Sequence, residues 1–290
     1  MVDPKKLLKQ VQSYERFKFL TKAIQMVALS QLSSLKNKIA SRQEALAPIV
    51  PFFSTSFDER DSDYIIVPIT VDKSCCGPHN GNIFKATRGI ADDIKEKNKQ
   101  FRIASIGNRA KFFFKRNYRS HQALSISNVD REPLSLFVSS ILSEKLLELG
   151  FDRCFFIFNR FYTAFKQNTS FYDVYSFNSF LSMVIDYAGH IVLDKYSHLY
   201  SSLLSSLRKD TGGFPNFLRD FYDYCFSMIF LDALEENEYS SLGARATAMN
   251  NATKNASELI ATLRLKYNKA RQEQITYELI DIVTAVNFVS

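Results

Sequence analysis

Apolar residues near the start of the chain recur every three or four positions between residues 5 and 47. This spacing places them on one side of an α-helix. Asp3 can cap the first turn, and Pro4 suits the first helical position because its missing N–H has no helical partner there. Pro48 and Pro51 follow, and a proline interrupts or ends a helix. The sequence therefore predicts one long helix over residues 5–47.

The last quarter of the chain has a similar pattern. Between Pro215 and Val289 there is no proline, and Gly243 is the only glycine. Apolar and small residues from Met249 to Val286 recur with a mean step of about 3.7 residues, which is helical but looser than a strict heptad repeat. We expect a single helix here, roughly 110 Å long.

The middle of the chain alternates between short apolar runs and helical patterns. Runs rich in β-branched and aromatic residues predict buried strands. We expect strands at residues 64–69, 101–106 and 153–158, with helices at residues 82–97 and 134–149 between them. This order is typical of an α/β unit with a largely parallel sheet. Residues 171–177 could add a strand, and residues 179–207 have an irregular helical pattern.

The predicted fold class is α/β plus a long antiparallel coiled coil, with paired N- and C-terminal helices and a central Rossmann-like α/β domain. We place the domain boundaries at residues 1–57, 58–212 and 213–290. A domain of ~150 residues is too small to cover so long a helix, so the other long helix is its natural partner. Their charges are complementary: residues 1–47 hold nine Lys/Arg and three Asp/Glu, and residues 214–290 hold seven and ten.

Composition narrows the functional classes. Hydrophobic residues make up 46% of the 290 residues, which is enough for a packed core. The net charge is +7, but the basic residues follow a patterned helix and form no Lys/Arg-rich tract, which argues against nucleic-acid binding. No run approaches the ~20 apolar residues of a membrane span, and we find no signal peptide. Any membrane association is therefore expected to be through a complex.

One short segment suggests metal or nucleophile chemistry. Asp72, Cys75, Cys76 and His79 lie close together in the sequence. A zinc site needs four well-spaced ligands, so a strand-to-helix turn is the more ordinary interpretation. The four cysteines form no disulfide framework, and the α/β region contains no glycine-rich phosphate loop. We expect no catalytic residue, no metal and no cofactor.

Three segments match one known family in order. Residues 21–28 read TKAIQMVA, residues 69–80 read ITVDKSCCGPHN and residues 244–256 read ARATAMNNATKNA. This set resembles the gamma subunit of F-type ATP synthases, with T-K-A-M-x-M-V-A, I-T-S-D-K-G-L-C-G-G-L-N and A-A-R-M-x-A-M-x-N-A-T-x-N-A. Ser74 and Pro78 replace two turn glycines of that family.

The resemblance implies a central stalk that carries no active site of its own. The paired helices would turn inside a hexamer of alpha and beta subunits, and the α/β domain would bind the delta and epsilon stalk subunits and the membrane c-ring. Proton flow through the ring would drive this rotation and thereby ATP synthesis. The expected location is the matrix side of the mitochondrial inner membrane, with the bacterial cytoplasmic face as the alternative.

The resemblance also implies roles for individual residues. Four polar residues would contact the beta subunit: Arg245, Lys22, Arg271 and Gln272. Each could instead be a solvated helix position, and Arg245 could pair with the opposite helix. An apolar tip would turn inside the hexamer or pack on residues 1–20: Ile275, Leu279, Ile282, Val283, Val286 and Phe288. The coiled-coil core would contain Ile24, Met26, Met249, Ala252, Ala256, Leu259 and Leu263.

Two other functions remain open from the residues alone. A coiled-coil scaffold with an α/β head would form a stable homodimer without a hexameric partner. A nucleotide-binding enzyme would bind a dinucleotide through the α/β domain.

Overall fold

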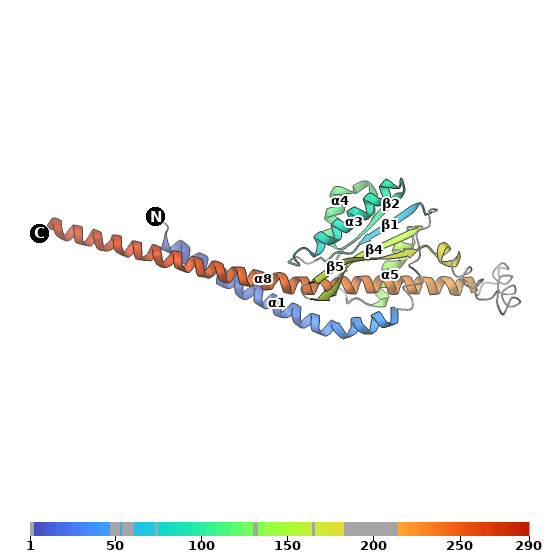
Figure 1. The fold of residues 1–290 in the computed structure, drawn as a ribbon, viewed down its shortest axis with the longest axis horizontal. Helices are drawn as coiled ribbons and strands as arrows, with labels where there is room; N and C mark the ends of the chain where they lie inside the picture. The colour runs from blue at the N-terminus through green and yellow to red at the C-terminus, as the bar shows by residue number, and fades with distance from the viewer. Residues whose placement is uncertain are drawn as a thin grey trace. The chain divides into compact units, whose positions relative to one another are not determined.

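The computed structural model describes residues 3–46, 53, 61–72, 75–129, 133–163, 166–182 and 214–289. Two long helices stand out, α1 (Pro4–Leu46) and α8 (Phe214–Val289) (Figure 1). Both confirm the helices predicted from periodicity. The chain forms two compact units, Met1–Gln31 with Arg245–Ser290, and Leu32–Ala244. Both unit boundaries fall inside long helices, whereas the sequence placed its domain boundaries in the connecting segments.

The larger unit is built on a five-stranded sheet with the order β3-β2-β1-β4-β5. The strands are β1 (Asp63–Pro68), β2 (Gln100–Ile106), β3 (Gln122–Ile126), β4 (Arg153–Thr163) and β5 (Lys166–Tyr175). The first four are parallel, and β5 runs antiparallel to β4 at the edge. The connecting helices are α3 (His79–Glu96), α4 (Asn108–Asn117) and α5 (Leu136–Leu147), with a short 3₁₀ turn η1 (Arg119–His121).

The three predicted strands and the two predicted connecting helices are confirmed, with shifted ends. Helix α3 begins three residues earlier than expected, and β4 continues to Thr163. Strand β5 begins at Lys166, not at residue 171. Helix α4, the short turn η1 and strand β3 were not predicted. Most of the helix expected at residues 179–207 lies outside the described residues.

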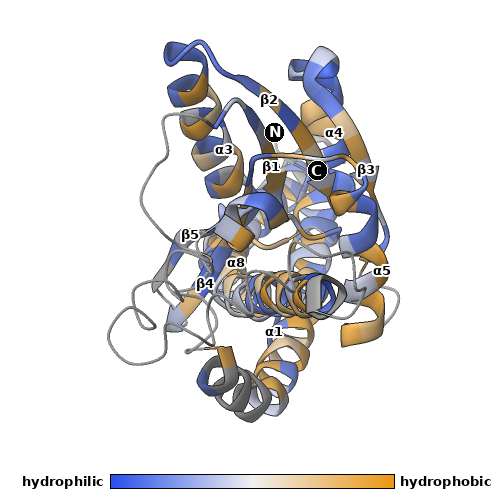
Figure 2. Cartoon of the chain, turned by 90° about the vertical axis from the view of Figure 1, so that its right-hand side faces the viewer, coloured by the Kyte–Doolittle hydropathy of each residue, from blue (hydrophilic) through white to orange (hydrophobic). Residues whose placement is uncertain are grey.

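Alternating side chains of the strands build a separate core on each face of the sheet. On one face, Ile65 and Phe156 pack with α5 and with residues 222–234 of α8. On the other face, Ile66 and Phe155 pack with α3 and α4. Figure 1 shows these two helix layers on opposite sides of the sheet, and in Figure 2 the covering helices α3 and α4 each carry apolar and hydrophilic residues.

A single glycine sets the entry into α4. Gly107 has a φ of 92°, and a Cβ added there would lie 2.3 Å from the carbonyl oxygen of Thr70. Only glycine tolerates both the backbone angle and the close approach. The start of helix α4 is therefore held close to Thr70, which follows β1, directly after β2 ends.

Candidate functional site

In the smaller unit, the residues of α8 that face α1 include a series with heptad spacing. The buried or half-buried positions after residue 257 are 260, 263, 267 and 270, with alternating steps of three and four. The same steps continue backwards through Ala256, Thr253, Met249 and Ala246. This is the spacing of a coiled-coil seam.

The opposite helix supplies buried Leu7, Val11, Thr21 and Ala28. The hydroxyl groups of Thr21 and Thr253 hydrogen-bond at 2.8 Å, and Glu15 forms an ion pair with Arg264. Lower numbers on α1 therefore meet higher numbers on α8, so the pair is antiparallel. Alanines in the seam let the two helix axes approach closely.

The seam ends where α1 begins. The register set by Thr21 and Thr253 places Pro4 opposite Ala270. From Arg271 to Thr284 every side chain of α8 is exposed. In Figure 1 the C-terminal end of α8 continues past the N-terminus of α1. Within the described residues, this end of α8 has no covering element in its own unit.

This uncovered end contains most of the predicted apolar tip. Ile275, Leu279, Ile282 and Val283 are between 43% and 61% exposed. The side chains of Val286 and Phe288 lie outside what the structure describes, although the helix continues through both.

The four predicted polar contact residues have different surroundings. Arg271 and Gln272 are exposed at the point where the seam ends, and Lys22 is exposed on α1. Arg245 is half-buried and already has an interaction partner. Three of the four are thus accessible to a partner, whereas Arg245 is engaged within the chain.

Two predicted core positions are wrong for this chain. Met26 is 63% exposed and Leu259 is 46% exposed. The seam instead uses Ala28 and Ile260, because the heptad register rotates the neighbouring apolar positions away from the partner helix. Met249 and Ala256 are buried, and Ile24, Ala252 and Leu263 are half-buried.

The helical pair exposes more large apolar side chains than it buries. Those on α1 are Leu8, Tyr14, Phe17, Phe19, Leu20, Met26, Val27 and Leu29. Those on α8 beyond residue 258 are Leu259, Leu265, Ile275, Tyr277, Leu279, Ile280, Ile282 and Val283. Exposed apolar surface on this scale marks an interface with other proteins.

In the larger unit, α8 is anchored by buried polar groups. The Asn237 side-chain oxygen lies 3.1 Å from Nε2 of His79 and accepts a bond from the backbone N–H of Asn159. All three residues are at most 2% exposed. The hydroxyl of Tyr172 donates to Asp232 at 2.6 Å. Burial, reinforced by the Asp232 charge, raises the pKa of Tyr172, so its phenol keeps the proton for this bond.

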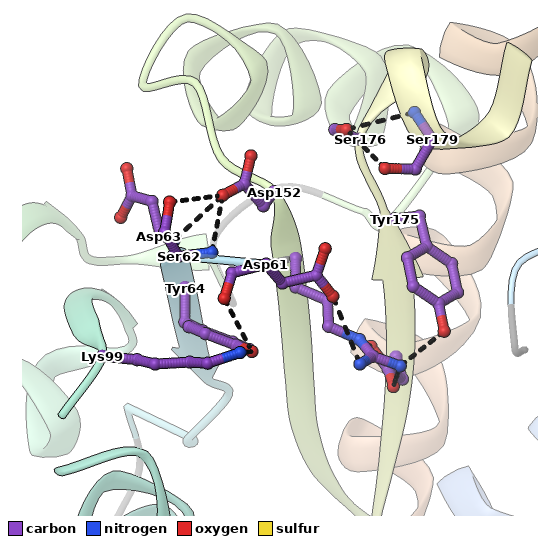
Figure 3. A network of polar contacts seen from close by, with 11 residues as sticks. Asp61, Ser62, Asp63, Tyr64, Lys99, Asp152, Tyr175, Ser176 and Ser179 are labelled. Carbon is purple, nitrogen blue, oxygen red and sulfur yellow. Dashed lines mark hydrogen bonds and ion pairs between the residues drawn. The ribbon is translucent and has the colours of Figure 1, made fainter. Parts of the chain in front are cut away.

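A second polar network holds the beginnings of β1 and β4 together (Figure 3). Arg153 is 1% exposed and forms ion pairs with Asp61 and Asp173 at 3.4 and 2.8 Å. Asp152 accepts bonds from the backbone N–H groups of Ser62 and Asp63 and from the Ser62 hydroxyl. Burial opposes ionisation of Asp152, but these bonds together lower its pKa. The network is structural, since every charge in it has a partner.

The segment that suggested metal chemistry is used for packing. Cys76 is buried against Val71 and Ala244, and Cys75 is exposed. The Asp72 carboxylate accepts a bond from the backbone N–H of Asn108 at the start of α4. Together with the bond from His79 to α8, these contacts shape a strand-to-helix turn.

The chain combines an α/β sheet with an antiparallel helix pair whose end is uncovered and partly apolar. This combination defines a stalk-type protein, which works by contact with other subunits. No described helix has a stretch that is both long and apolar enough to span a bilayer.

Comparison with known proteins gives the family. A family model described as ATP synthase matches residues 4–288. The ATP synthase gamma chain of Christiangramia forsetii is 30% identical over 304 residues, covering 98% of this chain and 97% of its own length. The mitochondrial ATP synthase subunit gamma of Arabidopsis thaliana is 26% identical, covering 96% and 83%.

A solved structure has the same fold. A chain of the Euglena gracilis mitochondrial ATP synthase, OSCP/F1/c-ring, superimposes with a TM-score of 0.77 at 19% identity, covering 98% of this chain and 93% of that one. The chain belongs to the gamma-subunit family of F-type ATP synthases, and the resemblance of its three sequence motifs to that family is confirmed.

Proposed function

We propose that this chain is the central rotor subunit of a proton-driven ATP synthase. It would transmit rotation of the membrane c-ring to a hexamer of alpha and beta subunits. The observation that carries this proposal is the uncovered end of α8, residues 271–284, in a chain that matches the ATP synthase family over residues 4–288. A coiled-coil scaffold unrelated to ATP synthesis is not favoured by that match.

The proposed mechanism is differential binding. A helical pair is not three-fold symmetric, so it presents a different surface to each of three beta subunits. Each beta subunit would then be biased toward a different conformation and a different nucleotide affinity. The exposed apolar residues of the tip suit a turning contact, because the hydrophobic effect is non-directional.

Three polar residues would contact the beta subunits. Arg271 and Gln272 are the first residues beyond the seam, and Lys22 is exposed on α1. A guanidinium group binds a carboxylate with two parallel hydrogen bonds, which gives Arg271 the strongest expected contact. Arg245 ranks below them, because it already has a partner.

We further propose that the chain carries no catalytic residue and that nucleotide chemistry takes place on the beta subunits. Delta and epsilon stalk subunits would bind the α/β unit together with the c-ring. The curated relatives include mitochondrial and bacterial gamma chains. The proposed location is the matrix side of the mitochondrial inner membrane, and the bacterial cytoplasmic face is the alternative.

Truncation after Tyr267 tests the role of the tip. The change removes the uncovered end of α8 and leaves the seam up to Tyr267. Proton-driven ATP synthesis in membranes from cells that carry only the truncated chain should fall strongly. Native mass spectrometry should still find alpha and beta subunits with the tagged chain. Unchanged synthesis would contradict the tip assignment, and a homodimer without alpha and beta would favour the scaffold.

The double substitution Arg271→Ala and Gln272→Ala tests the polar contact. Synthesis should slow while the complex stays assembled, because only side chains at one point are lost. The matched control is Lys269→Ala with Glu273→Ala, which changes two exposed neighbours on the same turns of α8. Equal effects of the two pairs would count against a specific contact.

A further inference from the structure

The outer surface of the α/β unit has a groove between α3 and α4, with a volume of about 920 Å³. Its α3 side is formed by Asn80, Phe84 and Arg88, and its α4 side includes Arg109, Phe112 and Arg116. Residues three or four apart share one helix face. The groove is therefore lined by one face of each helix, and we call it the α3–α4 groove.

The α3–α4 groove carries three positive charges and no lining carboxylate. Arg88, Arg109 and Arg116 are exposed, and none of them has an ion pair within the part of the chain that the structure describes. Asp92 follows Arg88 by four residues, but it lies outside the groove lining and forms no ion pair with Arg88 in the described part of the chain. Asp72 already accepts the backbone N–H at the start of α4. Among the described residues, no ion pair therefore neutralises the three arginines of the groove.

Aromatic side chains form the floor and one rim of the groove. Phe84 and Phe113 stack with their ring centroids 4.1 Å apart. The guanidinium of Arg88 lies 4.8 Å from the centroid of Phe113, which orients it by a cation–π contact. Phe112 is 69% exposed at the rim. A large apolar side chain among arginines is a composition enriched in protein interfaces.

The groove has a rigid base. Ala110 and Phe114 on α4 and Ile83 on α3 are fully buried beneath it. Phe84 and Phe113 also pack on this core, whereas the three arginines and Phe112 are exposed and can contact a partner without disturbing it.

We propose that the α3–α4 groove docks an acidic segment of another subunit of the complex, whose carboxylates bind the three arginines and whose apolar side chain packs on Phe112. The inference rests on the proposed function, because it requires an assembled rotor. A folded or extended protein segment fits a concave groove along its length, whereas a flat anionic membrane would reach only its rim. Guanidinium groups suit carboxylates by bidentate geometry.

Photo-cross-linking in the assembled complex tests this proposal. Phe112 is replaced by p-benzoyl-phenylalanine in a tagged chain, the complex is purified from native membranes, and the cross-linked peptide is identified by mass spectrometry. We expect a peptide of another subunit that contains several Asp or Glu residues and an aromatic or aliphatic residue. A cross-link to phospholipid, to a segment without acidic residues or to nothing would overturn the docking proposal.

Charge reversal with a matched control adds a second measurement. The variant R88E/R109E/R116E should lower the cross-link yield about tenfold or more, because like charges then face each other. The control K85E/K111E/K115E reverses three charges on the same helices outside the groove lining, and its yield should stay within about twofold. Equal losses in both variants would show that only net charge matters and would overturn the proposal.

The same purification distinguishes failure of the proposed rotor function from failure of the groove proposal. A tagged chain without alpha and beta subunits would overturn the proposed function and the groove inference together. A tagged chain within the ATP synthase but with the wrong cross-link would overturn the groove inference alone.

Discussion

Two regions of α8 show opposite environments within one helix. Between residues 222 and 234, most side chains are buried against β4, β5 and α5. Between residues 271 and 284, every side chain is exposed. The first region is organised for the stability of its own unit, and the second has a surface that no described element of its own unit covers.

The two regions also differ in the kind of contact. The buried region and the helical turn that follows it make directional bonds: Tyr222 donates to the carbonyl of Tyr175, Asp232 accepts from Tyr172, and Asn237 bonds to His79. Such bonds resist rotation of α8 about its own axis within that unit, because a hydrogen bond weakens steeply when its donor and acceptor are turned out of line. The exposed apolar end has no such constraint. A rotor needs both properties: a helix that is fixed within its own unit, and an exposed surface that can turn against its partners.

Two alanine substitutions give the strongest test of the difference between the buried and the exposed region of α8. Phe226→Ala removes a fully buried ring that packs on Phe156, and should lower the free energy of unfolding by about 3–5 kcal/mol. Leu279→Ala, on the exposed end, should change it by less than about 0.5 kcal/mol. Urea unfolding of the purified chain, followed by near-ultraviolet circular dichroism, measures both. Similar losses would show that the two regions do not differ as described.

The directional bonds are tested by Asn237→Leu. This substitution leaves His79 and the N–H of Asn159 each without one buried partner, and should cost about 1–3 kcal/mol. Ser241→Ala is the matched control, since the Ser241 hydroxyl donates to the carbonyl of Glu238 in its own helix. In the assembled complex, the Asn237 variant should also synthesise less ATP per proton translocated. A larger effect from the control would contradict the anchoring role.

The network at the strand ends predicts a pH dependence. The folded pKa of Asp152 is lowered, so its stabilisation is present above the unfolded value of about 3.9 and is lost as the pH falls through the folded pKa. Asp152→Asn should therefore cost about 1 kcal/mol at pH 7, and the difference from the parent chain should shrink in acid. The exposed Asp92→Asn serves as control. A constant difference at all pH values would argue against this linkage.

The smallest expected effect concerns the helical pair. Arg264→Ala removes the ion pair with Glu15, whose side chains are 63% and 42% exposed. An exposed pair contributes little, so the free energy of unfolding should change by less than about 0.5 kcal/mol. The substitution Thr21→Val, which removes a bond from the buried seam, should cost more, about 1 kcal/mol. The reverse order would mean that surface charge holds the helices together.

The sequence by itself determined the elements with strong local signals. The long helices follow from their periodicity and from the scarcity of glycine and proline. Strands β1 and β4 follow from continuous apolar runs, and β2 follows from a mainly apolar run that closes on Gly107. Helix α4 was missed because most of its residues are polar or basic and only Ala110 and Phe114 are fully buried. Strand β3 was missed because none of its side chains is fully buried, which removes the strand pattern.

Only the tertiary structure decided which side of each helix meets a partner. Leu259 and Ile260 are both large and apolar, and neighbouring residues on a helix point about 100° apart, so composition could not choose between them. The pairing of Thr21 with Thr253 fixed the register and buried Ile260. The α3–α4 groove arose in the same way, because its three arginines are scattered in sequence and are brought together only when α3 and α4 pack side by side on the sheet.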